Sequence, residues 1–128
     1  MPDKIRVLIA DDHRLFAEAL EAFLSNDERI EIVGTARDGE EAVRLAHEES
    51  PDVILMDIAM PKVDGVEATR QIRGNSGRAC VLMLTGSNST SDVARAREAG
   101  AAGYVTKDKI ASQLIETIVE LGSRTNGA

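Results

Sequence analysis

Short apolar runs alternate along the chain with longer segments in which apolar residues recur at helical spacing. The clearest run is Val53-Ile54-Leu55-Met56, which leads directly into Asp57 and is followed by turn residues at Pro61 and at Asp64-Gly65. A run this short, bounded by turn residues, is typical of a buried strand rather than a helix. The pattern predicts strands at residues 5–10, 30–35, 53–57, 79–84 and 101–106, with helices over the apolar positions of 15–24, 42–46, 66–72, 93–99 and 110–121.

Five strand–helix units in succession predict an α/β fold. We expect one doubly wound, five-stranded parallel sheet with five helices on its two faces. At 128 residues, the chain is expected to form a single domain. We expect this domain to span residues 1–121 and the polar segment 122–128 to be a flexible tail or the start of a linker.

The composition limits the classes of function. A net charge of −7 argues against a nucleic-acid-binding surface on this chain. The one cysteine, Cys80, excludes a disulfide framework and favours a reducing compartment, and its place within an apolar run predicts an inert core residue. No signal-peptide pattern and no run of about 20 apolar residues occurs. We therefore expect a cytoplasmic protein without a membrane span.

Polar residues follow the predicted strands at their carboxyl ends. Asp11 and Asp12 follow the first strand, Asp57 ends the third, Thr85 follows the fourth and Lys107 follows the fifth. In an open α/β sheet, ligands bind outside the carboxyl ends of the strands, where the strand order reverses. With the flavodoxin-like order 2-1-3-4-5, the first and third strands are neighbours, so the three carboxylates are expected to converge.

Converging carboxylates repel one another and call for a cation. Because all the ligands are oxygens, the expected ion is Mg²⁺, which also accepts phosphate oxygens. A lysine and a hydroxyl group on the next two strands are suited to the remaining oxygens of a phosphoryl group.

Each of these residues also has a simpler interpretation. Asp12 could cap the helix that follows it, Thr85 could be a turn hydroxyl and Lys107 a solvated charge. Asp57 is harder to explain in this way, because no helical pattern begins directly after it. No glycine-rich phosphate loop occurs, so a nucleotide site is not expected. His13 lacks the partners of a metal ligand or a catalytic triad, and we expect an exposed residue in the first turn of a helix.

Four segments, in this order and spacing, resemble the receiver domain of two-component response regulators across residues 5–121. They are Asp11-Asp12, Met56-Asp57-Ile58-Ala59-Met60-Pro61-Lys62-Val63-Asp64-Gly65, Leu84-Thr85, and Gly100-Ala101-Ala102-Gly103-Tyr104-Val105-Thr106-Lys107. The run Asp11-Asp12-His13, together with residues 103–108, is most similar to the subfamily that carries a C-terminal LuxR-type helix-turn-helix output domain.

The resemblance implies a role for each site residue. Asp57 would accept a phosphoryl group from a phosphohistidine of a sensor histidine kinase, which is nucleophilic catalysis by a carboxylate. The implied ligands of Mg²⁺ are Asp11, Asp12, Asp57 and the backbone carbonyl of Ala59, the implied phosphoryl contacts are Thr85 and Lys107, and the implied switch pair is Thr85 with Tyr104.

The implied function is a phosphorylation-activated signalling switch that dephosphorylates itself and is not a turnover enzyme. Phosphorylation would change the surface of the fourth helix, fifth strand and fifth helix, and homodimers would form there or through the first and fifth helices. The output would be transcription, with DNA contacted only by a domain absent from this chain. The alternatives are a stand-alone receiver that acts through protein contacts and an aspartyl-phosphate hydrolase. Hydrolases of the haloacid dehalogenase type have an Asp-x-Asp pattern after the first strand, whereas here Asp11 and Asp12 are adjacent.

Overall fold

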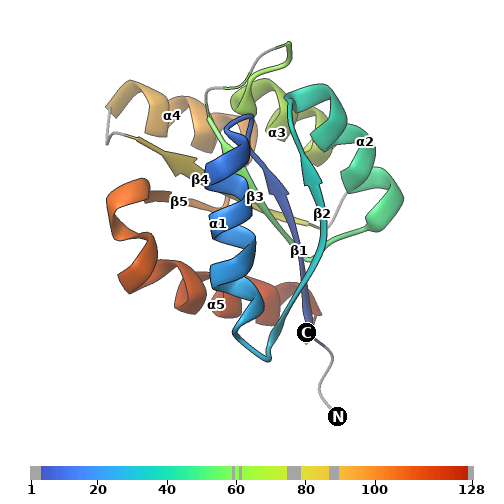
Figure 1. The fold of residues 1–128 in the computed structure, drawn as a ribbon. Coiled ribbons are helices and arrows are strands. Elements are labelled where there is room, and N and C mark those ends of the chain that lie inside the picture. Colours follow the sequence, from blue (N-terminus) through green and yellow to red (C-terminus); the bar gives the residue numbers. More distant parts are fainter. Residues whose placement is uncertain (1–3, 59, 61, 75–78, 87–89, 127–128) are drawn as a thin grey trace.

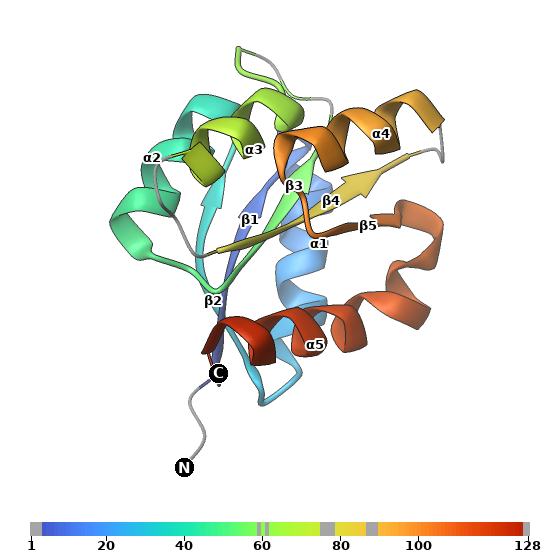
Figure 2. The same cartoon turned by 180° about the vertical axis from the view of Figure 1, so that it is seen from behind.

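The computed structural model describes residues 4–58, 60, 62–74, 79–86 and 90–126. Figures 1 and 2 show one central sheet with helices on both of its faces. The strands are β1 (Ile5–Ala10), β2 (Ile30–Ala36), β3 (Val53–Asp57), β4 (Cys80–Thr85) and β5 (Gly103–Thr106). The helices are α1 (Arg14–Ser25), α2 (Gly39–Glu49), α3 (Gly65–Gly74), α4 (Thr90–Ala99) and α5 (Ile115–Asn126), and a 3-10 turn (Lys107–Lys109) and a π-helical turn (Ile110–Leu114) precede α5.

The sheet has the strand order β2-β1-β3-β4-β5, and its paired strands are all parallel. This confirms the predicted α/β, flavodoxin-like fold and its order 2-1-3-4-5. Ala10 pairs with Met56 and Asp57 pairs with Leu84, so the ends of β1, β3 and β4 lie at one edge of the sheet. The reversal of strand order between β1 and β3 falls at the same edge.

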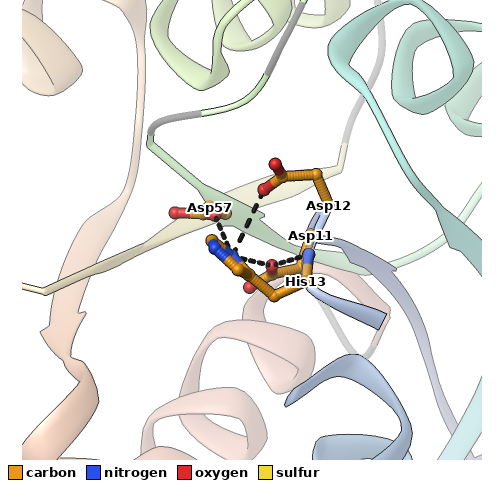
Figure 3. A group of neighbouring side chains, drawn as sticks. All are labelled: Asp11, Asp12, His13 and Asp57. Atoms are coloured by element: carbon orange, nitrogen blue, oxygen red, sulfur yellow. Dashed lines mark hydrogen bonds and ion pairs between the residues drawn. The ribbon is translucent and has the colours of Figure 1, made fainter. Parts of the chain in front are cut away.

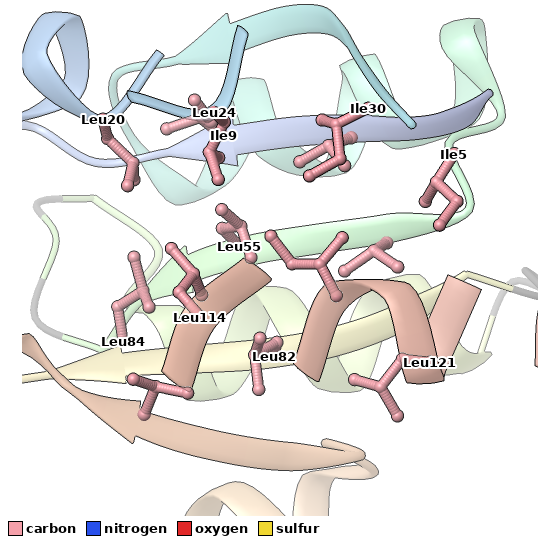
Figure 4. Packing of buried hydrophobic residues seen from close by; sticks show 14 of the residues in the cluster. Ile5, Ile9, Leu20, Leu24, Ile30, Leu55, Leu82, Leu84, Leu114 and Leu121 are labelled. Atoms are coloured by element: carbon pink, nitrogen blue, oxygen red, sulfur yellow. The ribbon is translucent and has the colours of Figure 1, made fainter. Parts of the chain in front are cut away.

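Side chains of the central strands alternate between two apolar layers, as expected of strands that are covered on both faces. In β3, Val53 and Leu55 pack in the layer of α1 and α5, whereas Ile54 and Met56 pack in the layer of α2, α3 and α4. Figure 4 shows the first of these layers. All five residues of β3 are buried, which explains why the run is continuously apolar up to Asp57.

The helices differ in how firmly they are attached to the sheet. On the α1 and α5 side, Leu24 and Ile118 are fully buried. A side chain of this size contributes roughly 1.5–3 kcal/mol when it is buried. Helix α4 instead buries the small side chains of Ala96 and Ala99 among its described residues. Helix α4 therefore gains much less apolar burial than α1 or α5.

Several boundaries differ from the prediction. Strand β4 includes Thr85, and β5 begins at Gly103 rather than at residue 101. The amide of Ala101 donates to the carbonyl of Ala96 at the end of α4, so this residue closes the helix instead of joining the sheet. The predicted cap of α4 falls at residues 87–91, of which 87–89 lie outside the described residues.

The end of the chain also differs from the prediction, because residues 122–126 are helical and extend α5 to Asn126. Gly122 is buried, and a Cβ atom at this position would lie 2.5 Å from Cγ2 of Ile5. This close approach holds the last turns of α5 against the start of β1. Among the described helices, none has both the length and the apolar character needed to cross a membrane.

Candidate functional site

Three carboxylates meet at the edge where β1 and β3 end (Figure 3). The side chains of Asp11 and Asp57 are 0% and 5% exposed, whereas that of Asp12 is 31% exposed. One potential ligand atom from each of these residues and from His13 lies within 4.8 Å of all the others. The predicted convergence of the three aspartates is therefore present in the structure.

The backbone of the two strands accounts for this convergence. Because β1 and β3 are hydrogen-bonded neighbours, the residues that follow Ala10 and Met56 emerge side by side. The amide of Asp11 donates to the carbonyl of Ala36 on β2, and the amide of Ile58 donates to the carbonyl of Leu84 on β4. Both strand ends are thus fixed by the sheet on either side of the cluster.

His13 is the residue of this cluster that the sequence analysis missed. Its Nδ1 lies 3.2 Å from Oδ1 of Asp11, 3.3 Å from Oδ1 of Asp12 and 3.8 Å from Oδ2 of Asp57. The ring is 66% exposed, as expected, but the prediction that it lacks partners for a metal site is wrong. The adjacency of Asp11, Asp12 and His13 was the available signal.

The side chain of Asp11 explains the position of His13. Its Oδ1 accepts a hydrogen bond of 2.8 Å from the amide of His13, which turns the chain immediately after β1. Helix α1 consequently starts at Arg14, with His13 as the residue that precedes its first turn. Asp12 is not the cap of this helix, so the simpler interpretation of that carboxylate is wrong.

Lys107 brings a cation to the cluster from the end of β5. Its Nζ lies 3.4 Å from Oδ2 of Asp11 and 3.9 Å from Oδ1 of Asp57. The same atom lies 4.4 Å from the centroid of the Phe16 ring on α1, a cation–π distance. Phe16, one of the apolar positions from which the sequence predicts the first helix, therefore also helps to hold the lysine beside the carboxylates.

The other predicted residues occupy different positions. Thr85 is buried at the end of β4, in the strand adjacent to that of Asp57. Tyr104 lies on β5, paired with Met83, and its side chain is exposed. Ala59, predicted to offer its carbonyl to the metal, lies outside the described residues.

The residues present fit a divalent cation. Three carboxylates supply hard oxygen ligands, and the partial exposure of Asp12 leaves one side of the cluster open to water. This donor set and this openness are the ligation that Mg²⁺ favours in proteins. The cluster could thus hold a metal ion, with Lys107 positioned beside it.

Comparison with known proteins places the chain in a family. A family model described as the response regulator receiver domain matches residues 7–119. The chain belongs to this family. The receiver is therefore a module of two-component signalling, as the motifs suggested.

The transcriptional regulatory protein DegU of Brevibacillus brevis is 43% identical to the receiver over 116 residues, which are 91% of this chain and 49% of that protein. The chain spans about half the length of this curated relative.

Two solved structures share the fold of the receiver. The signal receiver domain of the response regulator NarL from Mycobacterium tuberculosis superimposes with a TM-score of 0.91 at 32% identity, over 95% of this chain and 98% of that one. A LuxR-family two-component response regulator from Aurantimonas sp. SI85-9A1 has a TM-score of 0.89 at 34% identity, over 95% and 87% of the two chains. The second match agrees with the predicted similarity to LuxR-type regulators.

Proposed function

We propose that Asp57 is the phosphoacceptor of this receiver and that the cluster around it binds Mg²⁺. The observation that carries the proposal is the position of Asp57: a buried carboxylate, 3.9 Å from the Lys107 ammonium and within ligand distance of Asp11 and Asp12. A structural carboxylate would need only one cation beside it. Here a second and a third carboxylate crowd the same edge, which costs stability unless a further cation joins them.

The phosphoryl donor that fits this site is a phosphohistidine of a sensor histidine kinase. An oxygen of the Asp57 carboxylate attacks phosphorus, the P–N bond breaks with its electrons passing to the imidazole, and an acyl phosphate remains on Asp57. Asp11, Asp12, Asp57 and the carbonyl of Ala59 would hold the ion, which would neutralise charge on the phosphoryl oxygens. Lys107 pairs with one of those oxygens and moves away from the carboxylate of Asp11.

The charge of a phosphoryl group on Asp57 would change the surface formed by α4, β5 and α5. A phosphoryl group adds about −1.5 to −2 charges and three acceptor oxygens at the end of β3. Thr85, on the adjacent strand, donates its hydroxyl to one of these oxygens, and the movement of β4 changes the surroundings of Tyr104. Because α4 buries mainly small side chains, the surface of α4, β5 and α5 responds as a two-state element.

We propose that this surface controls assembly. The receiver forms a homodimer through α4, β5 and α5, or through α1 and α5. In the whole protein, a DNA-binding output domain of the LuxR type follows the receiver and regulates transcription. The receiver is a stoichiometric acceptor that loses its phosphoryl group by autodephosphorylation. The cytoplasmic location and a domain boundary near residue 121 stay predictions.

Acetyl phosphate tests the assignment directly. The parent protein and Asp57→Asn are incubated with Mg²⁺ and acetyl phosphate, and their intact masses are measured. We expect one phosphoryl group on the parent and none on the variant. Uptake by both proteins would assign the acceptor to another residue, and uptake by neither would reject the proposed function.

A further inference from the structure

The segment that follows Asp57 lies directly against the start of α2. Gly39, the first residue of that helix, is buried. A Cβ atom added to Gly39 would overlap the carbonyl oxygen of Val63 and would lie 2.6 Å from the carbonyl carbon and 2.9 Å from Cβ of the same residue. The obstacle is main chain, which cannot rotate away as the tip of a flexible side chain can. Any side chain at position 39 must therefore increase the distance between the start of α2 and the backbone at Val63.

A second contact ties the same two segments together. Asp38 caps α2 through a 2.8 Å hydrogen bond that its Oδ1 accepts from the amide of Glu41, and its Oδ2 lies 3.6 Å from Nζ of Lys62. The hydrogen bond from Glu41 and the charge of Lys62 lower the pKa of the Asp38 carboxyl, so this group stays ionised at neutral pH. Lys62 adopts a left-handed backbone conformation with φ of 65°, immediately before the residue that touches Gly39.

The other end of the segment is fixed on Asp57 itself. The amide of Gly65 donates a 3.1 Å hydrogen bond to the carbonyl of Ile58. A Cβ atom on Gly65 would overlap the carbonyl oxygen of Asp57 and lie 2.8 Å from Cα of Ile58. Gly65 is therefore tied to Asp57 and Ile58 by a hydrogen bond and by close packing, and Val63 lies only two residues before it.

We propose that Gly39 is a positioning residue of the phosphoacceptor site, acting through Val63. The absence of a side chain at Gly39, together with the Asp38–Lys62 ion pair, sets the distance between α2 and the segment that follows Asp57. This inference rests on the proposed function, because it concerns the geometry of the Mg²⁺ and phosphoryl ligands. Groups that orient metal ligands from outside the coordination sphere typically change affinity or activity by about 10–100-fold when they are altered.

The chain offers a matched control in Gly122. A methyl group added there would also meet a buried neighbour, since its Cβ would lie 2.5–2.9 Å from side-chain carbons of Ile5. Ile5 starts β1, and Asp57 ends β3, so this collision occurs at the opposite edge of the sheet from the cluster. Gly39→Ala and Gly122→Ala thus add the same group at crowded sites, but only one site adjoins the segment after Asp57.

The experiment measures the Mg²⁺ concentration that half-saturates phosphorylation by acetyl phosphate, and the Mg²⁺ affinity by isothermal titration calorimetry. Circular dichroism melting shows how far each variant is destabilised. We expect Gly39→Ala to raise the half-saturating concentration and the dissociation constant at least about 10-fold. For Gly122→Ala, we expect a lower melting temperature with unchanged Mg²⁺ dependence. Equal Mg²⁺ dependence in the two variants would overturn the inference.

A milder change keeps the test decisive if Gly39→Ala does not fold. Asp38→Asn retains a residue that caps helices well and removes the charge that faces Lys62. We expect a rise in half-saturating Mg²⁺ of up to about fivefold, the fold-change that corresponds to a surface ion pair. Glu31→Gln, an equal charge change at an exposed position of β2, is the control. No difference between these two variants would also overturn the inference, whereas a parent that takes up no phosphoryl group would reject the proposed function itself.

Discussion

The crowding of carboxylates at the sheet edge makes a quantitative prediction for Asp12→Asn. At an effective dielectric constant of about 20, two unit charges at the 4.8 Å limit of this cluster repel by about 3.5 kcal/mol, and in bulk water by about 0.9 kcal/mol. Because the Asp12 side chain is 31% exposed, its repulsion lies toward the lower figure. We expect Asp12→Asn to stabilise the protein without Mg²⁺ by about 1 kcal/mol, or about 4 °C in melting temperature.

With Mg²⁺ present, the parent should melt at a higher temperature than Asp12→Asn, the reverse of the order without the ion. At free Mg²⁺ of about 10–100 times the dissociation constant, binding stabilises the parent by roughly 1.4–2.7 kcal/mol, which corresponds to about 5–10 °C. Asp12→Asn lacks one charged ligand and loses most of this gain. The assay is differential scanning calorimetry of both proteins in EDTA and in Mg²⁺.

Glu31→Gln removes one negative charge at an exposed site and controls for the change in net charge. A gain from Mg²⁺ in Asp12→Asn equal to that of the parent would refute the assignment of this residue as a ligand. If Asp12→Asn melts in EDTA at a temperature no higher than Glu31→Gln does, repulsion between the carboxylates does not destabilise the metal-free protein.

Three further predictions concern other parts of the chain. Lys107→Met removes the cation beside Asp57, the proposed acceptor, and should slow phosphorylation by acetyl phosphate about 10²–10³-fold. The variant Lys109→Met, at an exposed neighbouring position, should leave the rate unchanged, and intact mass followed over time measures both rates. The pKa of the Asp27 carboxyl is lowered from its ordinary 3.8 to about 2, and the side-chain hydrogen bond from Arg29 is the largest cause. The stability that ionised Asp27 adds to the fold is therefore complete above pH 4 and is lost as the pH falls from about 4 toward 2. The carboxyl ¹³C shift of Asp27, followed by NMR against pH, should have its midpoint at about 2, and a midpoint at 3.8 would contradict the contact with Arg29. Leu24→Ala empties a fully buried site between α1 and the sheet and should cost about 2–5 kcal/mol in urea unfolding, and a loss below 1 kcal/mol would show that the site collapses without a cavity.

The strands and their order could be predicted because local and global signals agree. The run that ends at Asp57 is apolar throughout because β3 is covered on both faces, and its place between β1 and β4 makes the burial unavoidable. The edge that carries Asp11, Asp12 and Lys107 follows from the parallel order alone. The ends of the predicted strands were therefore enough to locate the cluster of charged side chains.

The parts that were not predicted depend on particular contacts in the folded chain, one local and one between residues near its two ends. The carboxylate of Asp11 accepts a hydrogen bond from the amide of His13, and this contact places the histidine beside the cluster. Gly122 belongs to a polar stretch that suggests a tail, but it is helical because it fits against Ile5 at the other end of the chain. A spacing rule within the sequence contains neither of these contacts.

The extension of α5 has a mechanical consequence. The helix is 12 residues long, or about 18 Å at 1.5 Å per residue, and it leads from the turns after Lys107 to the edge of the sheet where β1 begins (Figure 1). Its last turns pack on Ile5 at the start of β1, where Gly122 leaves no room for a side chain. Helix α5 and the first strand therefore have to move as one body. A substitution that enlarges residue 122 would loosen the C-terminal helix and the N-terminal strand together.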